Sequence, residues 1–88
     1  MIEGTTSTGF AFSISEEALN NMELLDAMAE MRDGDHLSMS KICLMLLGPE
    51  QRQRLYDHLR GESGNVPIDA VSRELMEIFN AKGAGGKN

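Results

Sequence analysis

Apolar and polar residues alternate near the start of the chain, after a polar opening segment. Residues 1–9 are rich in glycine, serine and threonine, which predicts a flexible N-terminus. Phe10, Phe12 and Ile14 then alternate with small residues, the period of two that is typical of a half-buried strand. Because one strand is not a sheet, this segment must pair with another chain, form a hairpin with the preceding residues, or lie extended over helices.

Helical patterns fill most of the remaining chain. The predicted helices cover residues 15–33, 38–47, 49–60 and 67–81. Each is followed by a glycine that can end a helix, and Pro49 and Pro67 suit the first turn of the last two. The glycine-rich residues 83–88 are predicted to form a disordered tail. The sequence therefore predicts a mainly α fold, with a single domain over residues 10–82. We expect a compact bundle of about four short helices with a short N-terminal β-strand or extended segment.

The first predicted helix carries three stripes along its surface. The first apolar stripe, predicted to face the core, consists of Ala18, Met22, Leu25 and Ala29. The acidic stripe consists of Glu23, Asp26, Glu30 and Asp33. The second apolar stripe consists of Leu24, Met28 and Met31. Together the apolar stripes span about 180°, wider than the ~100° of a one-sided surface helix. Either the domain itself holds this helix on two sides, or the second apolar stripe binds another molecule.

The last predicted helix is apolar on one side only. A sector of about 100° holds its apolar residues Ile68, Val71, Leu75, Ile78 and Phe79. That side docks either onto the core of the domain or onto a neighbouring subunit. The residues predicted to join subunits, in the strand and in this helix, are Phe10, Phe12, Ile68, Leu75 and Phe79. Seven methionines among 88 residues add flexible apolar side chains, which fill cores and also recur on surfaces that bind varied partners.

Charge is unevenly distributed along the chain. Fourteen acidic residues oppose eight basic ones, and the net charge of −6 argues against binding to the phosphate backbone of nucleic acids. Residues 1–35 contain eight of the acids and one base, Arg32, which suits a protein that meets a basic partner. The longest uncharged apolar run, residues 42–47, is far shorter than the ~20 residues of a membrane span. With one cysteine and no N-terminal signal pattern, the chain is expected in a reducing cytoplasm.

The sequence offers few residues for catalysis. Cys43 has no basic neighbour that would make it a thiolate, so a buried structural thiol is expected. His36 and His58 are not spaced as metal ligands, either with each other or with Cys43. We therefore expect no enzyme activity, no cofactor and no metal site.

Two alternative functions remain open at this point. A small DNA-binding or regulatory helical protein would use Arg52, Arg54 and Arg60 as phosphate contacts around a helix-turn-helix. A carrier protein would attach its prosthetic group at Ser38, although the segment 35–39 lacks the Asp-Ser pair of that class.

Several segments resemble a family of bacteriophage proteins. They are residues 18–25 (ALNNMELL), 46–51 (LLGPEQ), 55–60 (LYDHLR), 64–71 (GNVPIDAV) and 75–79 (LMEIF). In order and spacing they resemble the short tail assembly chaperones of long-tailed bacteriophages, over roughly residues 10–80. The resemblance consists of apolar positions and a "Leu-Leu-Gly, Gly-x-Val-Pro" rhythm, without a catalytic signature.

This resemblance implies a non-catalytic function in tail assembly. Such a chaperone binds the tape measure protein and keeps it soluble in the cytoplasm of the infected bacterial host, and it is absent from the mature virion. The family often makes a second, longer product by ribosomal frameshifting, which implies a further contact with the tail tube protein. A slippery site of that kind would encode Gly86 and Lys87. Weak multivalent coating of a long partner also favours a homo-oligomer, and neither a membrane nor a nucleic-acid partner is expected.

Overall fold

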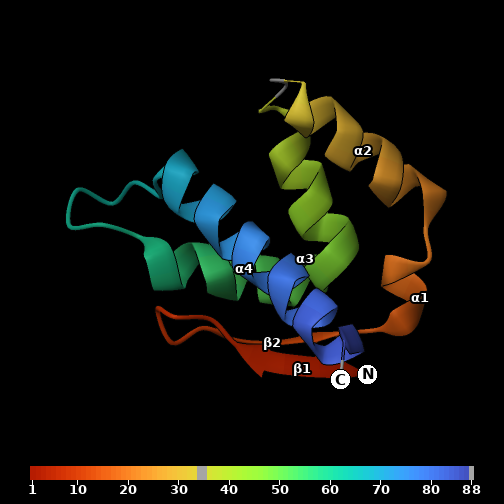
Figure 1. Cartoon of the computed structure of the whole chain (residues 1–88). Helices are drawn as coiled ribbons and strands as arrows, with labels where there is room; N and C mark the ends of the chain where they lie inside the picture. Colours follow the sequence, from red (N-terminus) through yellow and green to blue (C-terminus); the bar gives the residue numbers. More distant parts are fainter. Residues whose placement is uncertain (34–35, 88) are drawn as a thin grey trace.

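Two short strands precede four helices in the described part of the chain (Figure 1). The computed structural model describes the backbone of residues 1–33 and 36–87 and the side chains of residues 1–33 and 36–80. The elements are β1 (Ile2–Thr5), β2 (Ala11–Ile14), α1 (Glu16–Leu19), α2 (Met22–Arg32), α3 (Ser38–Leu59) and α4 (Ile68–Lys87). The mainly α-helical class predicted from the sequence is confirmed.

The predicted strand pairs with the residues that precede it. β1 and β2 run antiparallel, with Ile2 opposite Ile14 and Gly4 opposite Phe12. Gly4 is required there because a Cβ atom at this position would lie 2.7 Å from Cζ of Phe12. The prediction of a flexible segment 1–9 is therefore corrected: four of those residues form β1, and residues 6–9 form the turn of the hairpin.

Carboxylates of α4 hold the turn of this hairpin. The hydroxyls of Thr6 and Thr8 donate hydrogen bonds to the buried Glu74 carboxylate, at 2.8 and 3.0 Å. The backbone N–H and the hydroxyl of Ser7 donate to Glu77 at 2.7 and 2.6 Å. Hydrogen bonds to ionised groups are stronger than neutral ones. The turn is thus ordered by acceptors that lie about 70 residues further along the chain.

The helix predicted over residues 15–33 is broken into two. Ser15 caps α1 by accepting a hydrogen bond from the N–H of Ala18 at 3.1 Å. Asn21 caps α2 by accepting from the N–H of Glu23 at 3.0 Å. Asparagine side chains compete with the helical backbone for hydrogen bonds and favour N-caps. The break at Asn20 and Asn21 rotates α1 out of phase with α2.

α3 bends sharply at Gly48, where the sequence predicts a boundary between two helices. The φ of 83° and ψ of 167° at Gly48 are open to glycine and strained for other residues. Just after the bend, the Gln51 amide accepts from the N–H of Ser13 at 2.8 Å and donates to its carbonyl at 2.7 Å. It also donates to the carbonyl of Leu47 at 2.8 Å. One side chain therefore joins both arms of α3 to β2.

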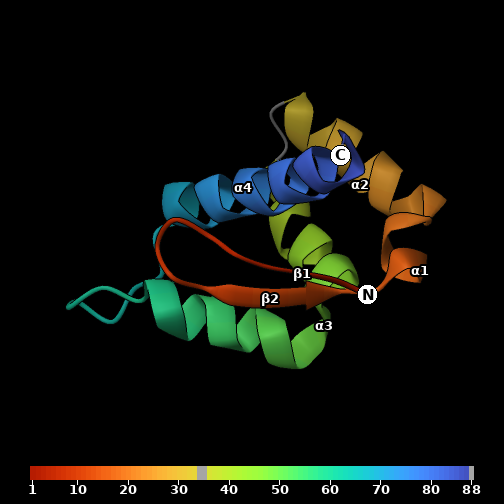
Figure 2. The same cartoon turned by 60° about the horizontal axis from the view of Figure 1, so that its bottom comes forward.

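The core lies where the hairpin meets α3 and α4. In Figure 2 the hairpin lies between α4 on one side and the second arm of α3 on the other. The large apolar side chains that are completely or almost completely buried are Ile14, Ile42, Leu55, Leu75 and Ile78. The hairpin also contributes the side chains of Phe10 and Phe12 to the core, where they are 3% and 4% exposed. The alternation that predicts the strand therefore marks the buried face of β2 correctly.

α4 is longer than the sequence predicts. Its backbone continues to Lys87, beyond the predicted end near Ala81, so residues 83–87 of the predicted tail lie within the helix bounds. An interior glycine weakens a helix by about 1 kcal/mol but does not by itself end it. The side chains of residues 81–88 and the whole of Asn88 lie outside the described residues.

Candidate functional site

The structure reverses the predicted positions of the two apolar stripes on α2. The stripe predicted to face the core is exposed, and the stripe predicted to bind a partner faces the core. Leu24 and Ala27 are buried, at 2% and 1% exposure, and Met28 and Met31 pack partly buried against the same core. Met22 is 67% exposed and Leu25 is 56% exposed, and Ala29 is also exposed. Leu24, Met28 and Met31 therefore form the inner stripe of α2.

The physical cause of this exchange is the helix break at Asn20 and Asn21. Ala18 lies on α1 and no longer extends the stripe of Met22, so that stripe loses its fourth member. Leu24, Ala27 and Met31 instead repeat at the spacing of a core-facing helix. The prediction that Leu24 binds a partner is corrected, because its side chain is enclosed by the chain itself.

The exposed residues Met22, Leu25 and Ala29 form what we call the α2 strip. Two residues of the acidic stripe lie on one side of it. Asp26 comes four positions after Met22, an offset of about 40° around the helix, and Glu23 comes one position after Met22, an offset of about 100°. A cleft of about 200 Å³ adjoins the strip, lined by Leu19, Leu24, Leu25, Met28 and Phe79. A second cleft of about 160 Å³ is lined by Leu25, Met28, Ala29 and Arg32. The strip thus continues into an apolar depression that reaches α4.

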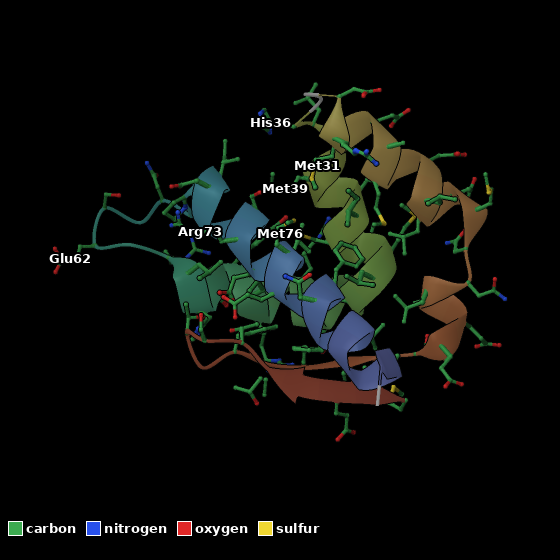
Figure 3. The ribbon with its side chains drawn as sticks, in the orientation of Figure 1. Met31, His36, Met39, Glu62, Arg73 and Met76 are labelled. Carbon is green, nitrogen blue, oxygen red and sulfur yellow. The ribbon has the colours of Figure 1, made fainter. Side chains whose placement is uncertain are left out.

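A larger opening lies at the other end of α4. A cleft of about 460 Å³ is lined by His36, Met39, Ser40, Gln53, Tyr56, Arg60, Val66, Ile68 and Val71. A neighbouring cleft is lined by His36, Met39, Ile68, Asp69, Ser72 and Arg73. Ile68 and Met76 are 65% and 56% exposed. Figure 3 draws Met31, Met39 and Met76 in the space between α4 and the junction of α2 with α3. Apolar side chains therefore line clefts at both ends of the described part of α4, Ile68 at one end and Phe79 at the other.

The residues predicted to join subunits separate into two groups. Phe10, Phe12 and Leu75 are core residues, with 3%, 4% and 0% exposure, so their prediction as contact residues is corrected. They are buried because the hairpin is completed within the chain and leaves its apolar face against α3 and α4. Phe79 is partly buried and lines the cleft beside α2, and Ile68 is open to solvent.

The candidate chemical groups lie apart from one another. Cys43 is completely buried, and burial raises the pKa of its thiol to about 11, against the smaller opposing effects of Arg52 and of a hydrogen bond with Tyr56. The Cys43 thiol is therefore protonated at neutral pH. His58 shares a hydrogen bond with the Thr8 hydroxyl at 3.0 Å, whereas His36 lines both clefts near the start of α4. Among the residues described, no group of three or more His, Cys, Asp or Glu side chains could hold a metal ion.

The residues of the two alternative functions are engaged within the chain. Arg60 donates to the Asp57 carboxylate at 2.9 Å and to the Gly64 carbonyl at 2.8 Å. Arg54 lies over the ring of Phe10, with 5.1 Å between its guanidinium carbon and the ring centroid. The Ser38 hydroxyl is buried and donates to the Glu30 carboxylate at 3.0 Å. Attachment of a prosthetic group at Ser38 would therefore require the junction of α2 and α3 to open.

Comparison with protein families, curated proteins and solved structures finds no match to this chain. The described helices include none with the length and apolar character needed to cross a bilayer. The α2 strip is exposed and apolar and continues into its adjoining clefts, so its chemistry suits the binding of apolar side chains.

Proposed function

We propose that this protein is a tail assembly chaperone of a long-tailed bacteriophage, which binds the tape measure protein and keeps it soluble. The observation that carries the proposal is the α2 strip, an exposed apolar surface beside a row of carboxylates. Exposed apolar surface of this kind costs stability in isolation and is typical of a site that another molecule covers. The resemblance of residues 10–80 to the tail assembly chaperones supplies the identity of the partner.

The surface suits a partner whose sequence varies along its length. Met28 lines the clefts beside α2, and Met22 and Met76 are more than half exposed. A methionine side chain adapts to differently shaped neighbours. A long helical partner presents many similar apolar faces and would be coated by several copies of a small chaperone. Adaptable contacts of low individual affinity serve that purpose, because several chaperone copies bound along one partner together hold it more tightly than a single copy does.

Several further assignments belong to the same proposal. The chaperone acts in the cytoplasm of the infected bacterial host and leaves the tail before the virion matures. A longer frameshifted form would carry the contact with the tail tube protein, and copies of the short form would associate on the partner. The protein acts by binding alone, with neither a cofactor nor a metal.

Co-expression with the tape measure protein tests the proposal. The tape measure protein is expressed alone, with the wild-type chain, and with a variant that carries Met22→Glu and Leu25→Glu. We expect it to aggregate alone, to remain soluble with the wild type, and to aggregate with the variant. The fraction in the supernatant after centrifugation is measured by gel densitometry.

Leu44→Glu is the matched control, since Leu44 is 40% exposed and lies outside the clefts beside α2. It should behave as the wild type does. A tape measure protein that stays insoluble with every form of the chain would refute the proposed function. If the double variant and the wild type solubilise it equally well, the function stands but the α2 strip is not its site.

A further inference from the structure

The cleft of about 460 Å³ lies where the bend in α3 meets the start of α4, and we call it the bend cleft. Both arms of α3 contribute to its lining, Ser40 from the first arm and Tyr56 from the second. Ile68 and Val71 line it from the first turns of α4. A concave site of this volume is typical of sites that bind small molecules.

The bend cleft offers apolar surface to a ligand. Its apolar lining residues are Met39, Val66, Ile68 and Val71. Ile68 is 65% exposed, although it is a large aliphatic residue. The apolar part of a ligand would leave water on entering the cleft and would cover part of this exposed surface, and both changes favour binding.

Arg52 brings a positive charge to the same cleft. Its Nη1 donates a hydrogen bond to the Ser40 hydroxyl at 3.3 Å, and its guanidinium carbon lies 5.9 Å from the centroid of the Tyr56 ring. No carboxylate among the described residues forms an ion pair with Arg52, and no second hydrogen bond of its side chain is found there. A guanidinium has five N–H donors, so Arg52 keeps donors for a ligand.

The other charges near the bend cleft balance one another. The carboxylate of Asp57 lies 2.9 Å from the guanidinium of Arg60. In the neighbouring cleft, Asp69 lies 3.5 Å from Arg73. No Asp or Glu is among the described residues that line the bend cleft. With histidine counted as neutral, Arg52 therefore leaves the cleft positive in a chain whose net charge is −6.

We propose that the bend cleft binds a small monocarboxylate with an apolar body, an aliphatic or aromatic acid. The carboxylate accepts hydrogen bonds from Arg52 and from the Ser40 hydroxyl, which accepts from Arg52 and keeps its own hydrogen for the ligand. One unbalanced guanidinium matches a single negative charge, and its fork of N–H groups fits a planar carboxylate. The apolar body lies against Ile68 and Val71.

This inference goes beyond the proposed function and does not rest on it. The bend cleft shares no lining residue with the two clefts beside α2, and none of its lining residues belongs to the α2 strip. A small acid and an apolar protein partner could therefore bind at separate places.

Tyr56 allows binding to be measured at the cleft itself. It is the only tyrosine of the 88 residues, and the chain has no tryptophan, so the intrinsic fluorescence of the protein comes mainly from a residue that lines the cleft. The probes are octanoate, octanamide, which has the same tail without the charge, and acetate, which has the carboxylate without the tail. Isothermal titration calorimetry gives the dissociation constants.

Octanoate should change the fluorescence of Tyr56 to a saturating value. Octanamide should bind about tenfold more weakly, as the loss of a hydrogen bond between charged groups would provide. Acetate should show no saturation, because it has no apolar body to take out of water. Ile68→Ser should weaken octanoate and octanamide alike.

Replacement of Arg52 supplies the decisive comparison. Arg52→Gln removes the charge and keeps an amide that can donate to Ser40, so it should weaken octanoate about tenfold and leave octanamide unchanged. The matched control, Arg54→Gln, has the same net charge and alters the same arm of α3, but the Arg54 guanidinium lies over the ring of Phe10. It should bind both probes as the wild type does. Thermal unfolding verifies that each variant is folded.

Several outcomes would overturn the inference. Absence of octanoate binding in calorimetry would do so directly, and equal affinity for octanoate and octanamide would remove the preference for a carboxylate. The same affinity for octanoate in Arg52→Gln and the wild type, or an equal loss in Arg54→Gln, would show that Arg52 does not hold the carboxylate. Loss of octanoate binding in the variant with Met22→Glu and Leu25→Glu would place the ligand on the α2 strip instead. The inference requires that variant to bind octanoate normally, whether or not it solubilises the tape measure protein.

Discussion

Replacing Leu24 and Leu25 separately by alanine tests which stripe of α2 faces the core. The two residues are adjacent and chemically identical, so their intrinsic helix propensities cancel in the comparison. They differ in environment, because Leu24 is 2% exposed and Leu25 is 56% exposed. The sequence pattern alone predicts the opposite, with Leu25 in the core and Leu24 outside.

The expected cost at Leu24 follows from its burial and from the space beside it. A buried leucine changed to alanine lowers the free energy of unfolding by about 2–5 kcal/mol, and the cost rises with the volume of the cavity that remains. Leu24 already borders a cleft of about 200 Å³, so the new space would be open to water and would not form a sealed void. We therefore expect about 2–3 kcal/mol, which lowers Tm by roughly 8–24 °C in a domain of this size.

The expected cost at Leu25 is much smaller. Full burial of a leucine contributes about 1.5–3 kcal/mol, and Leu25 obtains less than half of that burial. The higher helix propensity of alanine offsets a few tenths of a kcal/mol. Leu25→Ala should therefore lower the free energy of unfolding by under about 1 kcal/mol while weakening the binding of an apolar partner.

Urea denaturation followed by circular dichroism at 222 nm measures both variants against the wild type. The reasoning requires Leu24→Ala to be the less stable variant by at least about 1 kcal/mol. Equal costs would show that both sides of α2 are enclosed. A larger cost at Leu25 would refute the assignment of the α2 strip as a free surface.

Three further predictions concern the fold and its pH dependence. Gln51→Ala should lower the free energy of unfolding by about 1–3 kcal/mol through the loss of three hydrogen bonds, and Gln51→Glu should cost more because its carboxylate would face two carbonyl oxygens. A Gln51→Glu protein as stable as the wild type in urea would contradict this account. Gly48→Ala should cost about 1–3 kcal/mol by thermal unfolding, from backbone strain at φ 83° and without a clash, since no atom lies within 4 Å of the added Cβ. Gly61→Ala is its control, because the added Cβ would lie 3.7 Å from the nearest atom and the φ of Gly61 is not positive, so its Tm should change much less. The free energy of unfolding should fall as pH rises from 9.0 to about 11, because the Cys43 thiol keeps its proton in the folded state after the unfolded chain has lost it. Urea titrations across this range should show a smaller fall in Cys43→Ala, and parallel curves for the two proteins would disprove the linkage.

The bend in α3, the start of α4 and the strand could be predicted from local signals in the sequence. The bend at Gly48 and the start of α4 after Pro67 follow from residues that restrict or free the backbone where they stand. The buried face of β2 follows from the alternation of Phe10, Phe12 and Ile14. Each of these predictions needs a window of only a few residues.

The hairpin turn could not be predicted because its partners are remote in sequence. Thr6, Ser7 and Thr8 have the composition of a flexible segment, and nothing near them indicates order. Their hydrogen-bond acceptors Glu74 and Glu77 come about 70 residues later. Only the packing of the hairpin against α4 brings the two sets together.

The stripe predicted to bind a partner lies on the inner side of its helix. A period of 3.6 residues fixes which residues share a stripe, whereas the rotation of the helix about its axis depends on the whole domain. The adjacent asparagines at positions 20 and 21 are the signal that could have corrected the phase, since both favour helix caps over helix interiors. Ala18 lies on the separate helix α1 and would extend the outer stripe only if residues 15–33 formed one helix.

The hairpin also helps to explain why the cleft between Leu25 of α2 and Phe79 of α4 stays open. A small domain would gain stability if α4 moved towards α2 and covered Leu25 and Met76, which are both more than half exposed. Such a movement would draw Glu74 and Glu77 away from the turn hydroxyls that bind them. Glu74 is buried, so the loss of its hydrogen bonds would leave an uncompensated carboxylate in the interior, at a cost that exceeds the gain from covering one apolar side chain. The polar contacts of the hairpin thus hold α4 in place and leave this cleft preorganised, which reduces the free energy that a ligand must supply to enter it.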